Sequence, residues 1–292
     1  MDEHDWLAER FEADRTRLRA VAYRMLGSLS EADDAVQETW LRLSRADTSG
    51  VHNLGGWLTT LLARTCLDML RARTSRREEP VGAHLPDPII SRQDRVDPEQ
   101  QALLAEGIGL ALLVVLDTLT PAERVAFVLH DMFAVPFDQI APIVGRSPAA
   151  ARQLASRARR RVQAAGTVPE ADHGRQRAVV DAFLAAARGG DLQALVALLD
   201  PDVVLRADLG AMAADASREF RGAPAVAEQA LAFSGRARFA RPALVNGAAG
   251  LVVAPHGRLF AVLAFTITRG RIVELDILAD PERLRHLDLA QA

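Results

Sequence analysis

Apolar residues recur at helical spacing through the first 77 residues of the chain. Between residues 5 and 26 they lie three, four or seven positions apart, which predicts one long helix that ends at Gly27. The apolar positions of this helix are Leu7, Phe11, Leu18, Val21 and Met25. We expect Ser30 to cap a second helix and, after the loop SGVHNLGG, a third helix to begin near Trp57.

The helical period stops at residues 78–98 and then returns. Residues 78–98 hold four prolines, which predicts an extended linker. A helical block runs from residue 99 to about residue 165, and within it Thr120, Pro121 and Glu123 have the order of an N-terminal capping box.

The pattern changes after a second predicted linker at residues 166–174. Two short helices are expected first, and then alternating apolar and polar positions predict strands separated mostly by glycine-containing turns. The strand-like runs cover residues 202–209, 238–247, 250–257, 258–270 and 271–279. Helices followed by antiparallel strands predict an α+β domain with a curved sheet at residues 175–292, closed by a helix that starts at Asp280-Pro281.

Composition narrows the class of protein. The chain of 292 residues has a single cysteine, Cys66, so no internal disulfide can form, and a reducing cytoplasm fits. The acidic N-terminus lacks an apolar signal core, and no apolar run approaches the roughly 20 residues of a membrane helix. We therefore expect a cytoplasmic protein of two or three domains.

Charge distribution points to a nucleic-acid partner. The formal net charge is −3, yet residues 145–162 contain six arginines. In this stretch Gly145 ends one predicted helix, Ser147 caps the next, and Pro148 takes its first position. These features together predict a helix-turn-helix.

An ideal helical wheel with about 100° per residue divides the second of these helices into two faces. Apolar side chains occupy one face: Ala151, Leu154, Ala155, Ala158 and Val162. Small, polar and basic residues occupy or flank the other, and with the turn they give the candidate DNA-binding residues Arg146, Ser147, Ala149, Arg152, Gln153, Ser156, Arg157, Arg159 and Arg160. Arginine and glutamine can read base edges in the major groove, whereas the alternative is a solvated helix whose basic end suits its dipole.

Three stretches together resemble the extracytoplasmic-function (ECF) sigma factors. SEADDAVQETWLRL resembles their region 2.2, GGWLTTLLARTCLDMLRARTSRRE the part that melts and reads the downstream promoter element, and residues 116–162 their region 4. The resemblance implies domains at residues 1–77 (region 2) and 99–165 (region 4, reading the upstream element), with core RNA polymerase and promoter DNA as partners.

The same resemblance implies roles for particular residues of region 2. Core polymerase would bind Asp33, Asp34, Gln37 and Glu38, and the downstream element would contact Asn53, Trp57, Arg64, Asp68, Arg71 and Arg73. Arg76 and Arg77 would add charge there. The residues alone allow other interpretations. The acidic residues could form a solvated face at the start of a helix, and Trp57 could belong to the hydrophobic core.

The C-terminal part resembles the SnoaL-like branch of the NTF2-like folds, which is fused to sigma domains in the SigJ-type subgroup. Two further stretches resemble motifs of that subgroup and imply control of activity in cis: VGAHLPDP in the linker, and ILADPERLRHL near the end. The second is similar to the subgroup's Asn-Pro-Asp-Lys-Leu motif, with Ala279-Asp280 and Glu282-Arg283 as departures. The implied regulatory residues are Leu85, Pro86, Asp87, Pro88, Asp208, Asp280, Pro281 and Leu284. Of the subgroup's Asp-Gly-Gly-Gly-Lys motif only Asp208 and Gly210 remain, which puts a role for that motif in doubt.

Two other classes of function stay open. An enzyme would use Asp208, Asp276 or His256 as general acid or base, with Asp276 pointing into the cone, but the sequence has no metal, nucleophile or phosphate-loop motif. A stand-alone regulator would bind duplex DNA alone and sense a ligand. We expect a sigma factor that is not an enzyme and needs no cofactor or metal, with a small-molecule ligand of the C-terminal domain as a further candidate partner.

Overall fold

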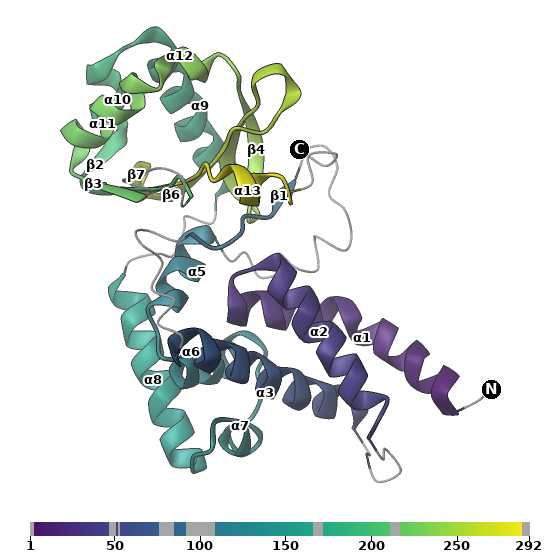
Figure 1. Cartoon of the computed structure of the whole chain (residues 1–292). Coiled ribbons are helices and arrows are strands. Elements are labelled where there is room, and N and C mark those ends of the chain that lie inside the picture. The colour runs from purple at the N-terminus through teal and green to yellow at the C-terminus, as the bar shows by residue number, and fades with distance from the viewer. Residues whose placement is uncertain are drawn as a thin grey trace. The chain divides into compact units, whose positions relative to one another are not determined.

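The computed structural model describes residues 3–46, 51, 53–75, 85–91, 109–165, 172–210 and 217–287 (Figure 1). Arg76 and Arg77 lie outside these residues. The chain forms two compact units. The first comprises Met1–Glu79, Gln101–Glu106 and Val115–Gly166, and the second Pro80–Gln100, Gly107–Val114 and Thr167–Ala292.

Three long helices open the first unit. They are α1 (Glu3–Leu26), α2 (Leu29–Leu43) and α3 (Leu54–Ser75), and each packs on the other two. Their shared core contains fully buried Leu18, Met25, Leu58 and Leu62. The apolar spacing of the sequence therefore predicted the buried face correctly.

The start of α2 corrects one expectation. Ser28, not Ser30, is the N-cap, and its hydroxyl accepts a hydrogen bond from the Glu31 N–H at 3.5 Å. Gly27 has a φ of +74°, so the chain turns directly after α1 and brings Ser28 into the extended conformation of a cap. Ser30 lies inside the first helical turn instead.

The rest of the first unit is a helix-turn-helix with a capped helix before it. Helix α5 (Leu110–Asp117) begins in the second unit and enters the first at Val115. It is followed by α6 (Pro121–Phe127), a π-helical turn η1 (Val128–Met132), α7 (Phe137–Val144) and α8 (Pro148–Ala164). The predicted capping box is present, because Thr120 and Glu123 each bond the other's backbone N–H. Helix α8 packs on α6 and α7, and α3 contacts the same two helices.

The contact between α3 and α6 is tight and partly polar. Cys66 on α3 is buried, and burial raises the pKa of its thiol to about 12. Arg124 on α6 is 2% exposed and forms an ion pair with Asp117. Its Nε and one Nη have no hydrogen-bond partner within the described part of the chain, so burying them costs free energy.

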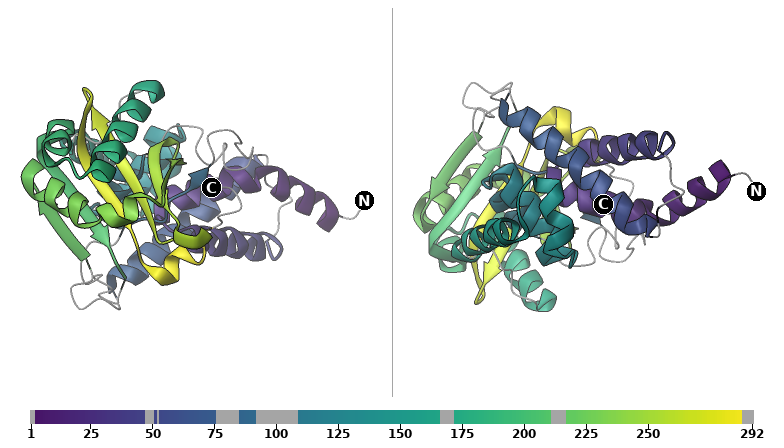
Figure 2. Two further views of the ribbon diagram at one scale, coloured as in Figure 1. Left: turned by 90° about the horizontal axis from the view of Figure 1, so that it is seen from above. Right: turned by 90° about the horizontal axis from the view of Figure 1, so that it is seen from below.

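The second unit is a curved sheet with helices on one face (Figure 2). Its strands are β1 (Ile90–Ser91), β2 (Leu199–Asp208), β3 (Ser217–Arg221), β4 (Ala240–Val245), β5 (Ala248–Val253), β6 (Ala261–Thr268) and β7 (Arg271–Leu278). Its helices are α9 (His173–Gly189), α10 (Leu192–Leu198), α11 (Ala223–Ala232), α12 (Ser234–Ala237), a short η2 (Pro255–Gly257) and α13 (Pro281–Leu284). The expected fold class is confirmed.

The strand order is β1-β4-β5-β6-β7-β2-β3. All pairs are antiparallel except β2 with β7, so the sheet is mixed where the sequence predicted an antiparallel one. Helices α11 and α12 carry the chain from β3 at one edge to β4. These two helices and β3 were not predicted, because their short runs lack a clear period.

The two faces of the sheet differ in chemistry. Leu275 and Ile277 of β7 pack into the apolar core beneath the helices. Asp276 lies between them and so points to the opposite face, which overturns the expectation that it points into the cone. There Arg206 donates to Asp276 at 3.2 Å and to Glu274 at 2.9 Å, with Glu219 3.8 Å away.

This cluster gives the C-terminal domain a pH-dependent stability. Asp276 is 1% exposed, and burial raises the pKa of its carboxyl from 3.8 to about 7 although Arg206 opposes the shift. The folded protein therefore keeps a proton that the unfolded chain releases between these two values. Stability falls as pH rises through that window, by at most about 1.4 kcal/mol per pH unit, and levels off above it.

We predict that Asp276→Asn removes this part of the pH dependence. Calorimetry of the full chain should show the melting temperature of the C-terminal domain falling between pH 5 and pH 7, and falling less in the variant. Asp202→Asn, at an exposed position of β2, is the matched control and should follow the unmodified protein. Equal slopes for all three proteins would contradict the assignment.

Candidate nucleic-acid interface and linker latch

Helix α8 has the local structure that the sequence predicted. Gly145 adopts a φ of +67°, which lets α7 end and the chain turn within three residues. Ser147 caps α8 by accepting a hydrogen bond from the Ala150 N–H at 3.3 Å, and Pro148 takes the first helical position. The apolar face is buried as expected: Ala151, Leu154, Ala155, Ala158 and Val162.

The arginines of α8 fall into two groups. Arg157 and Arg161 pair with Glu123 of the capping box at 3.3 and 3.2 Å, and Arg159 donates to Asp131 at 2.7 Å. These three contacts attach the C-terminal half of α8 to α6 and η1. Acidic neighbours thus already neutralise some of the arginines that were predicted from the sequence to contact DNA.

The remaining basic side chains keep their charge for another partner. Arg146, Arg152 and Arg160 have no acidic partner among the described residues. The guanidinium of Arg152 lies 5.3 Å from the ring centre of Phe137, and Gln153 beside it is exposed. Arg152 and Gln153, together with the small Ala149 and the half-buried Ser156, form an open surface at the N-terminal half of α8, and Arg160 is exposed two turns further along.

A second basic surface lies on α3. Arg64, Asp68 and Arg71 are exposed and spaced four and three residues apart, so they form one stripe along the helix. Arg73 lies apart from this stripe because it donates to the Leu26 carbonyl at 3.2 Å and to Glu31 at 3.1 Å. Its contacts tie the end of α3 to the end of α1 and the start of α2.

Two other predicted DNA contacts lie at the start of α3. The side-chain oxygen of Asn53 accepts a hydrogen bond from the Gly56 N–H at 3.0 Å, so this amide stabilises the helix start. Trp57 is half-buried, between the two alternatives that the sequence left open.

The acidic residues of α2 are not equivalent. Arg19 binds Asp33 at 2.6 and 3.1 Å, and Arg42 donates to Glu38 at 2.8 Å. Asp34 and Gln37 are exposed. Gln37 also borders a hollow of about 210 Å³ beside Phe11 and Trp40, so the surface combines negative charge with apolar area.

The predicted linker is ordered on the C-terminal domain where it is described. Residues 85–91 are extended, and β1 at their end pairs with β4 at the edge of the sheet. The Asn246 side chain accepts a hydrogen bond from the Ile89 N–H at 2.9 Å, and the Asn246 N–H donates to the Ile89 carbonyl at 2.8 Å. Leu85, Pro86, Pro88, Ile89 and Ile90 are buried.

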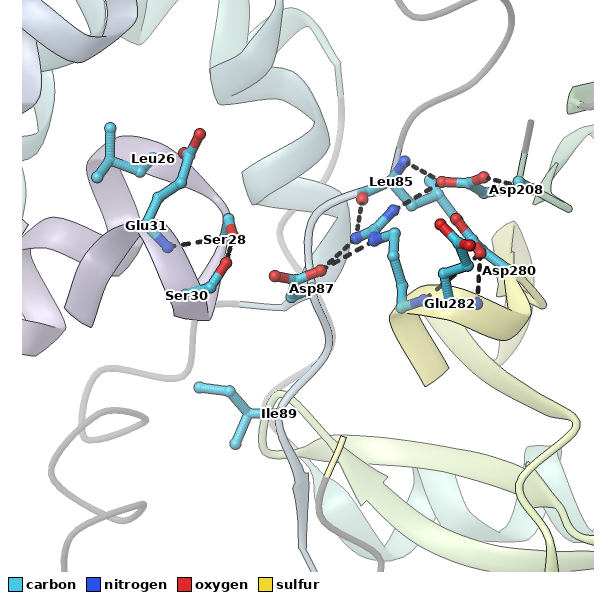
Figure 3. A network of polar contacts seen from close by, with 12 residues as sticks. Leu26, Ser28, Ser30, Glu31, Leu85, Asp87, Ile89, Asp208, Asp280 and Glu282 are labelled. Carbon is cyan, nitrogen blue, oxygen red and sulfur yellow. Dashed lines mark hydrogen bonds and ion pairs between the residues drawn. The ribbon is translucent and has the colours of Figure 1, made fainter. Parts of the chain in front are cut away.

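Arg283 of α13 fastens the start of this segment. It donates to Asp208 at 2.8 Å, to Asp87 at 3.0 Å and to the Leu85 carbonyl at 2.6 Å, while the Leu85 N–H donates to Asp208 at 3.1 Å. We call these four residues the linker latch (Figure 3). The guanidinium binds two carboxylates and a carbonyl at once through the donors of its planar fork.

The neighbouring residues hold the latch in shape. Asp280 caps α13 by accepting from the Glu282 N–H at 2.8 Å, with Pro281 at the first position and Leu284 buried, which together orient Arg283. Gly210 has a φ of +75°, and a Cβ there would lie 2.6 Å from the Asp280 carboxyl carbon. The two residues kept from the glycine-rich motif, Asp208 and Gly210, therefore both serve this contact.

Sequence reasoning placed most of these residues but missed two. Leu85, Asp87, Asp208 and Asp280 were expected from the family motifs. Arg283 was regarded only as a departure from the lysine of the C-terminal motif. Its positive charge at that position was the signal that could have identified it. Asn246 gave no signal, because only the fold brings it beside Ile89.

The catalytic candidates do not form a site. Asp208 belongs to the latch, Asp276 points to the outer face of the sheet, and His256 is exposed in η2. The part of the chain that the structure describes contains no group of three histidine, cysteine or carboxylate side chains that could hold a metal. Within the same residues, no helix is both long and apolar enough to cross a membrane.

Comparisons with known proteins agree with the geometry. Residues 10–76 match the model of Sigma-70 region 2, and residues 109–162 match that of Sigma-70, region 4. The ECF RNA polymerase sigma factor SigJ of Mycobacterium tuberculosis is 41% identical over 94% of this chain and 91% of its own length. The probable ECF RNA polymerase sigma factor SigI of the same organism is 34% identical over 97% of both chains.

A solved structure extends the likeness to the whole architecture. The crystal structure of Mycobacterium tuberculosis SigJ superposes with a TM-score of 0.79 at 37% identity, and it covers 97% of this chain and 99% of its own. Both helical regions and the C-terminal sheet thus have counterparts in one protein. The chain belongs to the ECF sigma factors of RNA polymerase and shares with SigJ a C-terminal sheet domain.

Proposed function

We propose that this protein binds core RNA polymerase, recognises a promoter through two separate elements and starts transcription, under control of its own C-terminal domain. The observation that carries the proposal is the surface of α8, where Arg152 and Gln153 stand exposed on a helix whose other face is buried. A sigma factor makes no covalent bond itself, and the matching families suggest no catalysis.

Base readout is assigned to the first turns of α8. In a helix-turn-helix the N-terminal residues of the second helix meet base edges in the major groove. Arg152 and Gln153 have the donors and acceptors for bidentate contacts, and Ala149 leaves space for close approach. Arg146 and Arg160 are placed for phosphates, whereas Arg157, Arg159 and Arg161 mainly hold α8 on its neighbours.

Region 2 would contribute the downstream element and the polymerase contact. The exposed Arg64 and Arg71 on α3 suit a single-stranded backbone, with the half-buried Trp57 near a base. On α2, Asp34 and Glu38 present negative charge, and Gln37 with its neighbouring hollow adds polar and apolar contact area. A basic helical surface of the polymerase would complement this patch.

Control in cis is assigned to the linker latch. Residues 85–91 lie in sequence between the two sigma regions, so fixing them on the sheet ties their connection to the C-terminal domain. Whenever Arg283 holds Leu85 and Asp87, less chain is free between the regions. Release of the latch would return that length and so change how both regions reach polymerase and DNA.

We predict that Arg152→Ala and Gln153→Ala alter base preference at the upstream element. Each should cost about 1–3 kcal/mol on the preferred sequence and less on sequences changed at the contacted base pair. Transcription by the holoenzyme across a library of upstream elements measures this. The control is Gln163→Ala, at an exposed position in the last turn of α8. An equal loss of transcription on every sequence would mean that Arg152 and Gln153 contact phosphates and not bases.

A second prediction concerns polymerase. Reversing charge with Asp34→Arg and Glu38→Arg should weaken binding to core RNA polymerase at least about tenfold, because like charges would then face each other. Competition for core enzyme measures the loss, and Glu228→Arg, an exposed acid on α11, should leave it unchanged. A stand-alone DNA-binding regulator, the competing interpretation, would keep its activity in the double variant.

The latch gives a third prediction. Arg283→Gln should weaken docking of the linker by about 2–4 kcal/mol, because it removes the charged partner of Asp208, which is buried, and of Asp87, which is partly buried. Transcription by this variant should then match that of the chain shortened before Asp280 and differ from that of the unmodified chain. Arg285→Gln, which loses only a 3.7 Å pair with Glu282, is the matched control. Identical transcription by all four proteins would show that the linker latch does not regulate activity.

A further inference from the structure

The C-terminal domain encloses an apolar cavity that neither DNA nor polymerase contact requires. Its volume is about 180 Å³, and it lies between the concave face of the sheet and helices α9, α11 and α12. Seven of the residues that line it are alanines, among them Ala187, Ala207 and Ala230. These small side chains leave space that larger ones would fill, so the domain gives up packing energy to keep the cavity.

The size of the cavity sets the size of its occupant. An apolar cavity of about 150 Å³ in another protein stays dry and binds benzene. The present one has room for a substituted benzene ring or an apolar chain of similar bulk. Its inner wall, which includes Leu205, Leu251 and Phe183, offers dispersion contacts without hydrogen-bonding groups.

Two exposed aromatic rings stand at the edge of this cavity. Phe233 and Phe260 both line it, yet they are 49% and 39% exposed. They are the only phenylalanines among the large exposed apolar side chains of the described residues. Apolar rings that remain in water beside an apolar cavity mark its opening as a binding surface rather than part of the core.

A positive charge is held between these rings. The guanidinium of Arg236 lies 4.8 Å from the ring centre of Phe260 and 5.8 Å from that of Phe233. Within the described residues, Arg236 has no carboxylate partner, and the only other ionisable residue lining the cavity is Arg218. Arg188 fixes this corner by donating to the carbonyls of Ala237 and Ala240 at 3.1 and 2.9 Å.

From these observations we propose that the cavity binds a small amphiphilic anion. Its apolar part, a single ring or an equally small chain, enters the cavity between Phe233 and Phe260, and its carboxylate pairs with Arg236 at the opening. The charge selects anions over neutral molecules of the same shape. An effect of the anion on transcription would rest on the cis control proposed above, whereas the binding itself does not.

The test is calorimetric titration of the full chain with phenylpropionate, octanoate and the neutral phenylpropanol. Both anions should bind at one site, and phenylpropanol at least about tenfold more weakly, since it lacks the charge-assisted bond. Arg236→Gln should abolish this difference, and Arg236→Lys should restore most of it. Arg238→Gln removes a neighbouring arginine that does not line the cavity and should change nothing.

A cavity-filling variant tests where the apolar part lies. Ala230→Phe places a ring in the space and should abolish binding of all three compounds, with a melting temperature that shows the domain still folded. Absence of anion binding, equal affinity for the alcohol, or binding that survives Ala230→Phe would each overturn the proposal. Transcription without added compound is measured in parallel, so failure of the ligand site is distinguishable from failure of the sigma function.

Discussion

The side chain of Arg283 connects parts of the sequence that are about 200 residues apart. Its guanidinium is shared by Asp208 at the end of β2, Asp87 in the linker and the Leu85 carbonyl. Each carboxylate would be costly to bury alone, and the arginine compensates both with short charge-assisted bonds. This one group therefore joins residues 85 and 87 of the linker to helix α13 and to the end of β2.

The latch also explains why the linker is part of a domain rather than a tether. Two prolines keep residues 85–88 extended, and from Ile89 the chain pairs with the edge strand β4 through Asn246 and β1. An extended segment with buried side chains and satisfied backbone groups behaves as a strand of the sheet that it joins. Few backbone bonds hold so short a strand, which suits the release proposed above.

The arginine-rich helix illustrates how charge is divided between folding and recognition. Its C-terminal arginines bind Glu123 and Asp131, so they are part of the packing of α8 on α6 and η1. Among the described residues, Arg146, Arg152 and Arg160 have no such acidic partners and remain available. One stretch of positive charge therefore has two roles. In the C-terminal domain Arg206 and Arg236 show the same division: the first is paired with buried acids, and the second lies over aromatic rings with no carboxylate partner among the described residues.

The sequence by itself determined the local structure: the helix period, the Thr120 and Ser147 caps, the Gly145 turn and the buried face of α8. These features depend on residues within a few positions of one another, which a pattern can report. The pairing of β1 with β4, the parallel contact of β2 with β7 and the direction of Asp276 depend on register between distant strands. Only the tertiary structure decided them. For the same reason Arg283, Asn246 and the cavity edged by Phe233 and Phe260 became evident once the sheet had brought separate segments together.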